Sequence, residues 1–175
     1  MKKILVTGGA GFIGYHLSKR LAAAGHQVTI ADNFFRSRND ADLAALLALP
    51  NVALIEADLT KPEAWESIGT GYDEVYHLVG INGTKYFYEI PHEVLRIGVS
   101  TTMNVLEWFR SKNGKPDAKI LYTSSNEAYA SALEAFGKLP IPTPENVPLV
   151  ISDTYNPRWS YGGQKLIGEL FFVHY

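Results

Sequence analysis

Three glycines, Gly8, Gly11 and Gly14, recur every third residue directly after an apolar run near the amino terminus. Glycine suits such a turn because it adopts positive φ and has no Cβ, so the backbone can come close to a diphosphate. The helix expected after the turn would point free N–H groups and the positive end of its dipole at that anion. The turn, with Phe12 and Ile13, is therefore predicted to bind a dinucleotide; the alternative is a plain structural turn.

A carboxylate, Asp32, stands eighteen residues after Gly14, at the end of the second apolar run. From that place a carboxylate can accept hydrogen bonds from both ribose hydroxyls of an adenosine. It would repel the 2′-phosphate of NADP, whereas Arg36 and Arg38 would attract one unless they are simply solvated surface residues. We therefore expect NAD as the cofactor, with NADP as the less favoured alternative.

A phenol and an ammonium, on Tyr161 and Lys165, lie four residues apart and so share one face of a predicted helix. Tyrosine is a poor base near neutral pH, because its unperturbed pKa is about 10. A neighbouring ammonium and a bound, positively charged nicotinamide would both lower the pKa of this phenol. The pair is suited to removing a proton from a hydroxyl, although Tyr and Lys at this spacing also occur on ordinary amphipathic helices.

Apolar runs alternate with helical periodicity along the chain, a pattern typical of βαβ units around a parallel sheet. Strands are expected at residues 3–7, 27–31, 52–56, 74–78 and 119–123. Helices are expected at about 13–24, with Ile13, Leu17, Leu21 and Ala24 on the buried face, at about 91–112 and from about 158 onward. Caps of two shorter helices are expected at 39–40 and 60–63.

The segment from 124 to 160 carries five prolines and little periodicity, and it is predicted to form a long ordered loop. Together these elements predict one Rossmann-type domain over residues 1–175, with a doubly wound parallel sheet in a three-layer α/β/α arrangement.

Composition argues against several classes of protein. The 16 basic and 18 acidic residues give a net charge of −2 with no basic stripe, so nucleic acid is not an expected partner. There is no cysteine, and the histidines lack metal-ligand spacing, so neither a disulfide nor a metal site is expected. No apolar run approaches the ~18 residues that span a bilayer, and we expect a cytoplasmic protein.

In combination, these motifs resemble the extended short-chain dehydrogenase/reductase family, the NAD-dependent nucleotide-sugar epimerases and dehydratases. The matching stretches are 7–14, 32–33, 58–59, 77–80, 123–129 and 158–169. The resemblance implies that Tyr161 is the catalytic base, that Lys165 lowers its pKa and holds the ribose, and that Ser125 hydrogen-bonds the reacting sugar oxygen. It also implies cofactor contacts from Asn33, Asp58, Leu59, Leu78, Val79 and Gly80.

The chain departs from the family pattern at several positions. Gly98 and Thr101 stand where family members usually carry Asn and Gly in the long helix, and Ala130 replaces the glycine after Tyr129. The missing Asn normally helps to order the nicotinamide side of the pocket. His77 is expected to serve the fold at the end of a strand, and not to act as a base.

The type of reaction depends on the residues after Ser125. Oxidation of a C4 hydroxyl by Tyr161 and NAD would leave a 4-keto sugar. Dehydratases typically continue with Asp-Glu, but this chain has Asn126-Glu127, and asparagine has no acidic proton to give. Some related dehydratases and decarboxylases keep only the Glu, whereas a 4-epimerase needs neither carboxylate. The sequence alone therefore ranks 4-epimerase first, and dehydratase or decarboxylase, with Glu127 in a catalytic role, second.

The substrate is expected to be a UDP- or dTDP-hexose, with Lys85 and Asn126 among its contacts. Lys85 lies in the segment 82–88 after the fourth strand, whose aromatic residues would alternatively fill the core. No sugar-binding lobe follows the last helix. We therefore expect either part of a protein about twice as long or a short, non-catalytic NAD-binding or dimerising module, with a homodimer formed through the two long helices.

Overall fold

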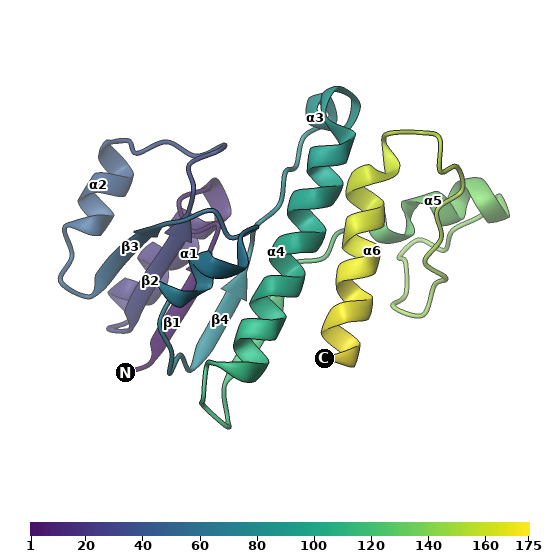
Figure 1. Ribbon diagram of the computed structural model, residues 1–175. Coiled ribbons are helices and arrows are strands. Elements are labelled where there is room, and N and C mark those ends of the chain that lie inside the picture. Colours follow the sequence, from purple (N-terminus) through teal and green to yellow (C-terminus); the bar gives the residue numbers. More distant parts are fainter. The chain divides into compact units, whose positions relative to one another are not determined.

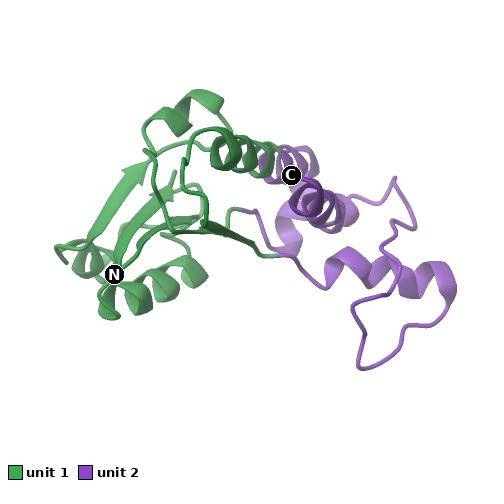
Figure 2. Cartoon of the chain, turned by 90° about the horizontal axis from the view of Figure 1, so that it is seen from below, with its two compact units in different colours: residues 1–79, 100–123 green, residues 80–99, 124–175 purple.

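The computed structural model describes residues 1–175, which form two compact units. Unit 1 comprises residues 1–79 and 100–123, and unit 2 comprises residues 80–99 and 124–175 (Figure 2). The boundary crosses the long helix α4 (Pro91–Ser111), so each unit contains part of it. None of the helices has both the length and the apolar character needed to cross a membrane.

Unit 1 is built on a five-stranded parallel sheet with the strand order β3-β2-β1-β4-β5 (Figure 1). The strands are β1 (Lys3–Thr7), β2 (Gln27–Asp32), β3 (Val52–Glu56), β4 (Glu74–His77) and β5 (Lys119–Tyr122). All five predicted strands are confirmed, with one-residue differences at the ends of β2, β4 and β5. The chain order reverses between β1 and β4, the kind of place where ligands bind in open α/β sheets, beyond the carboxyl ends of the strands.

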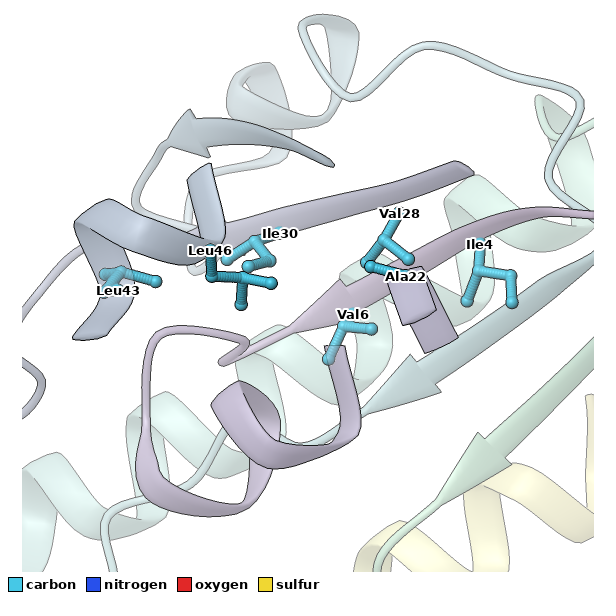
Figure 3. Close-up of a cluster of buried hydrophobic side chains, with 7 residues drawn as sticks. All are labelled: Ile4, Val6, Ala22, Val28, Ile30, Leu43 and Leu46. Atoms are coloured by element: carbon cyan, nitrogen blue, oxygen red, sulfur yellow. The ribbon is translucent and has the colours of Figure 1, made fainter. Parts of the chain in front are cut away.

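One face of this sheet is covered by α1 (Phe12–Ala23) and α2 (Ala41–Leu47). Figure 3 shows the buried cluster between these helices and the sheet, which consists of Ile4, Val6, Ala22, Val28, Ile30, Leu43 and Leu46. Alternate residues of β1 and β2 supply it, because strand side chains point to opposite faces in turn. Asp40 caps α2 by accepting a hydrogen bond from the N–H of Leu43, as its position in the sequence predicts.

The predicted buried face of α1 is partly wrong. Ile13 is 66% exposed and Ala24 is also exposed, whereas Gly14, Ser18 and Ala22 are buried. These three small residues recur every fourth position, so they let the helix axis approach the sheet closely. Close packing through small side chains turns the larger Ile13 toward solvent.

The opposite face of the sheet meets η1 (Pro62–Glu66), a short 3-10 helix, and the second half of α4. Thr102 of α4 contacts His77 of β4, and the ring of Trp108 lies 5.3 Å from that of Trp65 and 5.8 Å from that of Tyr72. The sheet therefore lies between two helical layers, which confirms the predicted three-layer α/β/α architecture.

Unit 2 is helical and contains α3 (Thr84–Glu89), the first half of α4, α5 (Glu127–Phe136) and α6 (Trp159–His174). Helix α5 corrects the prediction of a continuous loop from 124 to 160. Four alanines favour the helix, and Gly137, with a φ of 69°, ends it in the left-handed conformation. The prolines that suggested a loop begin only at Pro140, after this helix is complete.

The start of α1 yields a stability prediction. A Cβ on Gly14 would lie 2.5 Å from the Cα of Gly9 and would overlap the carbonyl oxygen of Gly8. We expect Gly14→Ala to lower the free energy of unfolding by about 2–3 kcal/mol, although alanine normally favours a helix by ~1 kcal/mol. Urea denaturation measures this change.

Gly163→Ala in α6 is the matched control, since the nearest atom to its Cβ would be 3.9 Å away. It should leave the stability unchanged or raise it slightly. Equal effects of the two substitutions would show that the tight turn does not need glycine.

Candidate active site

The turn after β1 has the geometry expected of a diphosphate-binding turn. Gly8 adopts a φ of 69°, and a Cβ there would lie 3.2 Å from the backbone of Leu78 and Val79 at the end of β4. Helix α1 has Gly11 at its N-cap, with no capping side chain and no acidic residue in its first turn. Its first N–H groups therefore remain available to an anion, and the turn fits the diphosphate of NAD.

Next to this turn, the carboxylate of Asp32 is held by three hydrogen bonds. Oδ2 accepts one from the N–H of Ala10 at 3.1 Å, and Oδ1 accepts two at 2.9 Å, from the N–H of Phe34 and the hydroxyl of Ser37. A carboxylate offers about four acceptor positions, so capacity for a ribose hydroxyl remains. The exposed Arg36 and Arg38 flank Ser37.

Four further residues of unit 1 that the sequence singles out have clear local partners. His77 is fully buried, with Nδ1 2.8 Å from Thr7 Oγ1 and Nε2 3.3 Å from Thr102 Oγ1, as expected of a histidine that serves the fold. Asp58 accepts hydrogen bonds from the N–H and hydroxyl of Thr60. The carbonyl of Leu59 accepts from Trp65 and Asn104, while Asn33 stabilises its own turn by accepting from Phe35. Their cofactor contacts stay predictions.

In unit 2, helix α6 carries the phenol and the ammonium on one face, as their spacing predicts. Lys165 Nζ lies 5.6 Å from the centroid of the Tyr161 ring, and the two residues are only 3% and 9% exposed. Burial lowers the pKa of Lys165 to about 8. This ammonium therefore loses its proton far closer to neutral pH than an exposed lysine does. A Cβ on Gly80 would lie 3.8 Å from the same Nζ.

Helix α3 adds an aromatic residue that sequence reasoning did not assign to the site. The ring of Phe87 stacks on that of Tyr161 with centroids 5.1 Å apart and an 18° angle between planes. Phe87 is 6% exposed, whereas the neighbouring Tyr88 is 53% exposed, so the segment fills the core with one of its aromatics. The side chain of Lys85 is 73% exposed and lies 3.8 Å from Glu89, and its substrate contact stays a prediction.

The start of α5 brings a carboxylate to the start of α6. Arg158 lies 3.3 Å from Glu127 Oε1, while Oε2 is buried without a hydrogen-bond partner. Glycine at position 162 allows this approach, since a Cβ there would lie 2.7 Å from the carbonyl oxygen of Glu127. Glu127 is thus anchored through one oxygen, and its other oxygen has no hydrogen-bond partner within the chain. Sequence reasoning missed Arg158, which it used only to mark the helix start.

The polar residues before Glu127 line an open pocket of about 330 Å³ in unit 2. Ser125 accepts a hydrogen bond from the N–H of Glu127 at 3.2 Å and donates one to Asn126 Oδ1 at 3.3 Å. Ser124 donates to Glu169 across the same pocket. The pocket offers hydroxyl, amide and carboxylate groups of the kind that bind a sugar. No group of three or more His, Asp or Glu side chains is placed to hold a metal ion.

Comparisons with known proteins agree with this arrangement. UDP-N-acetyl-alpha-D-glucosaminuronate decarboxylase from Bacillus cytotoxicus is 31% identical over 99% of this chain and 50% of its own length. UDP-glucuronic acid decarboxylase 6 from Arabidopsis thaliana is 34% identical over 75% of this chain and 36% of its own. A crystal structure of UDP-galactose 4-epimerase, 30% identical, superposes with a TM-score of 0.76 over 96% of this chain and 49% of that one.

The chain thus spans at most about half the length of these relatives. Residues 4–175, nearly the whole chain, match the NAD dependent epimerase/dehydratase family of enzymes. With the glycine turn, Asp32 and the Tyr161–Lys165 pair in place, the chain belongs to this NAD-dependent family.

Proposed function

We propose that the protein oxidises a UDP-hexuronic acid at C4 with NAD and then releases its carboxylate as CO₂. The observation that carries the oxidation step is the buried Tyr161–Lys165 pair, with the lysine pKa lowered to about 8. The observation that favours decarboxylation is Glu127, whose free oxygen is buried beside α6. The names of the two decarboxylase relatives support the same choice.

The residues of unit 1 would hold the cofactor by its adenosine half. The turn from Gly8 to Gly14 suits the diphosphate, and Asp32 suits the adenosine ribose, which favours NAD over NADP. When bound, NAD accepts a hydride from the sugar and later returns it. The side chains of this chain would supply the proton transfers and the stabilisation of charge that the other steps need.

Tyr161 would take the proton of the C4 hydroxyl while the C4 hydride leaves, so that a ketone forms at C4. The ammonium of Lys165 stabilises the phenolate that this requires. Its pKa of about 8 limits this help to pH values below about 8, because the neutral amine offers no positive charge. Ser125 would donate a hydrogen bond to the sugar oxygen as negative charge develops on it.

The ketone at C4 makes the C5 carboxylate that of a β-keto acid. The bond between C5 and the carboxylate carbon then breaks, its electron pair moves toward the C4 oxygen, and CO₂ leaves an enolate. A proton added at C5 restores the ketone, and hydride return with a proton from Tyr161 restores the hydroxyl. This proton comes from solvent water, and we assign its delivery to C5 to Glu127, which Arg158 anchors through its other oxygen.

A 4-epimerase is the second candidate, and it is the one that the sequence alone ranks first. Asn126 supplies no acid beside Glu127, and epimerisation needs only rotation of the ketone before the hydride returns. The solved UDP-galactose 4-epimerase, 30% identical, supports this alternative.

We also propose a homodimer that forms through the long helices. Two apolar side chains of α6 support it, because Leu170 is 53% exposed and Val173 is 78% exposed.

Replacing the phenol tests the proposed function directly. We expect Tyr161→Phe to lower turnover of UDP-glucuronic acid at least about 100-fold, because the base for the C4 hydroxyl is lost. Binding of NADH, followed by fluorescence titration, should change less than about twofold, since the fold is kept. Tyr155→Phe is the matched control, because Tyr155 is 95% exposed. Turnover that survives Tyr161→Phe would contradict the proposal, and NADH binding without turnover in the parent would indicate a non-catalytic module.

Glu127→Gln separates decarboxylation from epimerisation. If Glu127 protonates C5 after CO₂ has left, this variant should release CO₂ normally in the first turnover. Its steady-state release from UDP-glucuronic acid should be about 100-fold slower, while NADH and the enolate accumulate. An epimerase acting on UDP-galactose should lose little activity. Glu134→Gln on the same helix is the control, since Glu134 is exposed. Steady-state CO₂ release at the parent rate would rule out this role for Glu127.

The stability cost of Lys165 should depend on pH. Below about pH 8 the folded state buries a charged ammonium, whereas above it the folded state loses the proton before the unfolded state does, at about 10.5. Lys165→Met should therefore be more stable than the parent at pH 7, by up to roughly 3 kcal/mol, and the difference should shrink between pH 8 and 10.5.

Chemical denaturation of the parent and of Lys165→Met across this pH range gives the comparison. Lys85→Met is the control, since the exposed Lys85 should show no such trend. A difference between the parent and Lys165→Met that stays constant over the range would mean that Lys165 is not charged and buried as described.

A further inference from the structure

A carboxamide from α6 occupies the space that a side chain on residue 98 of α4 would need. A Cβ built on Gly98 would overlap Oε1 and Cδ of Gln164 and would lie 3.1 Å from its Cγ. Gln164 is only 2% exposed, and Gly98 is buried as well. The glutamine therefore adopts this position only because residue 98 has no side chain.

The amide nitrogen of this glutamine is directed to the surroundings of Lys165. Nε2 is buried and has no hydrogen-bond partner. The point where a Cβ on Gly80 would lie is 3.9 Å from Nε2 and 3.8 Å from Lys165 Nζ. The side-chain nitrogens of Gln164 and Lys165 thus both lie close to the backbone of Gly80. Because Gly80 has no side chain, there is room for both.

We propose that Gln164 is a positioning residue for Lys165, and that it can take this place only because residue 98 of α4 is glycine. The role rests on the proposed function, in which Lys165 supplies the working ammonium. Because residue 164 immediately precedes Lys165, the rotation of α6 that places the carboxamide over Gly98 also sets the direction of the lysine.

The cost of this arrangement argues that it serves more than packing. A glycine inside a helix is less favourable than alanine, and a buried amide without an acceptor is less favourable than an apolar side chain of the same size. A leucine at position 164 would fill the same space without an unpaired polar atom. The carboxamide instead brings Nε2 to the same point beside Gly80 that Lys165 Nζ approaches.

A reciprocal swap tests the pairing of the two residues. We expect Gly98→Asn to lower the Tm by at least about 5 °C or to prevent folding, because the new side chain overlaps Gln164. Gln164→Ser should lower the Tm through the space that it leaves. The double variant Gly98→Asn/Gln164→Ser should recover at least half of the Tm that Gly98→Asn alone loses. The same comparison with Gly98→Ala, with and without Gln164→Ser, repeats the test with a smaller side chain. Losses that merely add would overturn the pairing.

The positioning role needs a readout at Lys165 itself. We propose NMR titration of the ¹³Cε-labelled lysines, with the Lys165 signal assigned through Lys165→Arg, in the absence of cofactor. Gln164→Ser should raise the Lys165 midpoint by at least half a pH unit, because burial by its neighbours is what lowers the pKa of Lys165, and the double variant should lower it again. A midpoint unaffected by Gln164→Ser would overturn the role even if the Tm values were coupled. Neither measurement uses NAD or a sugar, so its failure is distinct from failure of the Tyr161→Phe test.

Discussion

Close approach of backbone to backbone, possible only where a residue has no side chain, is the constraint on which both units depend. In unit 1, Gly14 lets the first turn of α1 rest on Gly8 and Gly9, and this contact directs the helix N-terminus at the end of β1. In unit 2, Gly162 lets α6 rest on the first residue of α5. In unit 1 the glycine lies in the turn that suits a diphosphate, and in unit 2 it directly follows Tyr161, so packing and chemistry share the same segments.

The sheet was predictable because its information is local. Each strand is a short apolar run, and the turn residues between runs have few alternatives, so the strand ends differ by at most one residue. The errors arise where a tertiary preference overrides a local one. Ile13 fits the apolar period of α1, but small residues at 14, 18 and 22 pack closer to the sheet. Helix α5 was not predicted, because the prolines that follow its end suggested a loop for the whole segment from 124 to 160.

The candidate site, like the sheet, was predictable where its residues follow from local sequence patterns. Tyr161 and Lys165 follow from a four-residue spacing, and Asp32 follows from its place at the end of β2. Phe87 and Arg158 were not predictable as parts of the site, because each contacts a residue brought to it only by the fold. The place of Gln164 was not predictable either, because it depends on how α6 packs against Gly98 of α4. The aromatic run from 86 to 88 was a usable signal for Phe87, but no local pattern tells which of its rings is buried.

The distribution of unsatisfied polar atoms argues that unit 2 is shaped by chemistry as much as by stability. Trp159 Nε1, Ser160 Oγ, Gln164 Nε2 and Glu127 Oε2 are all buried without a hydrogen-bond partner, and all lie on or against the first turns of α6. Each such atom is destabilising by about 1–3 kcal/mol unless a partner is supplied. A helix selected for packing alone would replace them with apolar side chains. Their concentration next to Tyr161 and Lys165 is what a site produces when its polar groups are arranged for a substrate and only secondarily for one another.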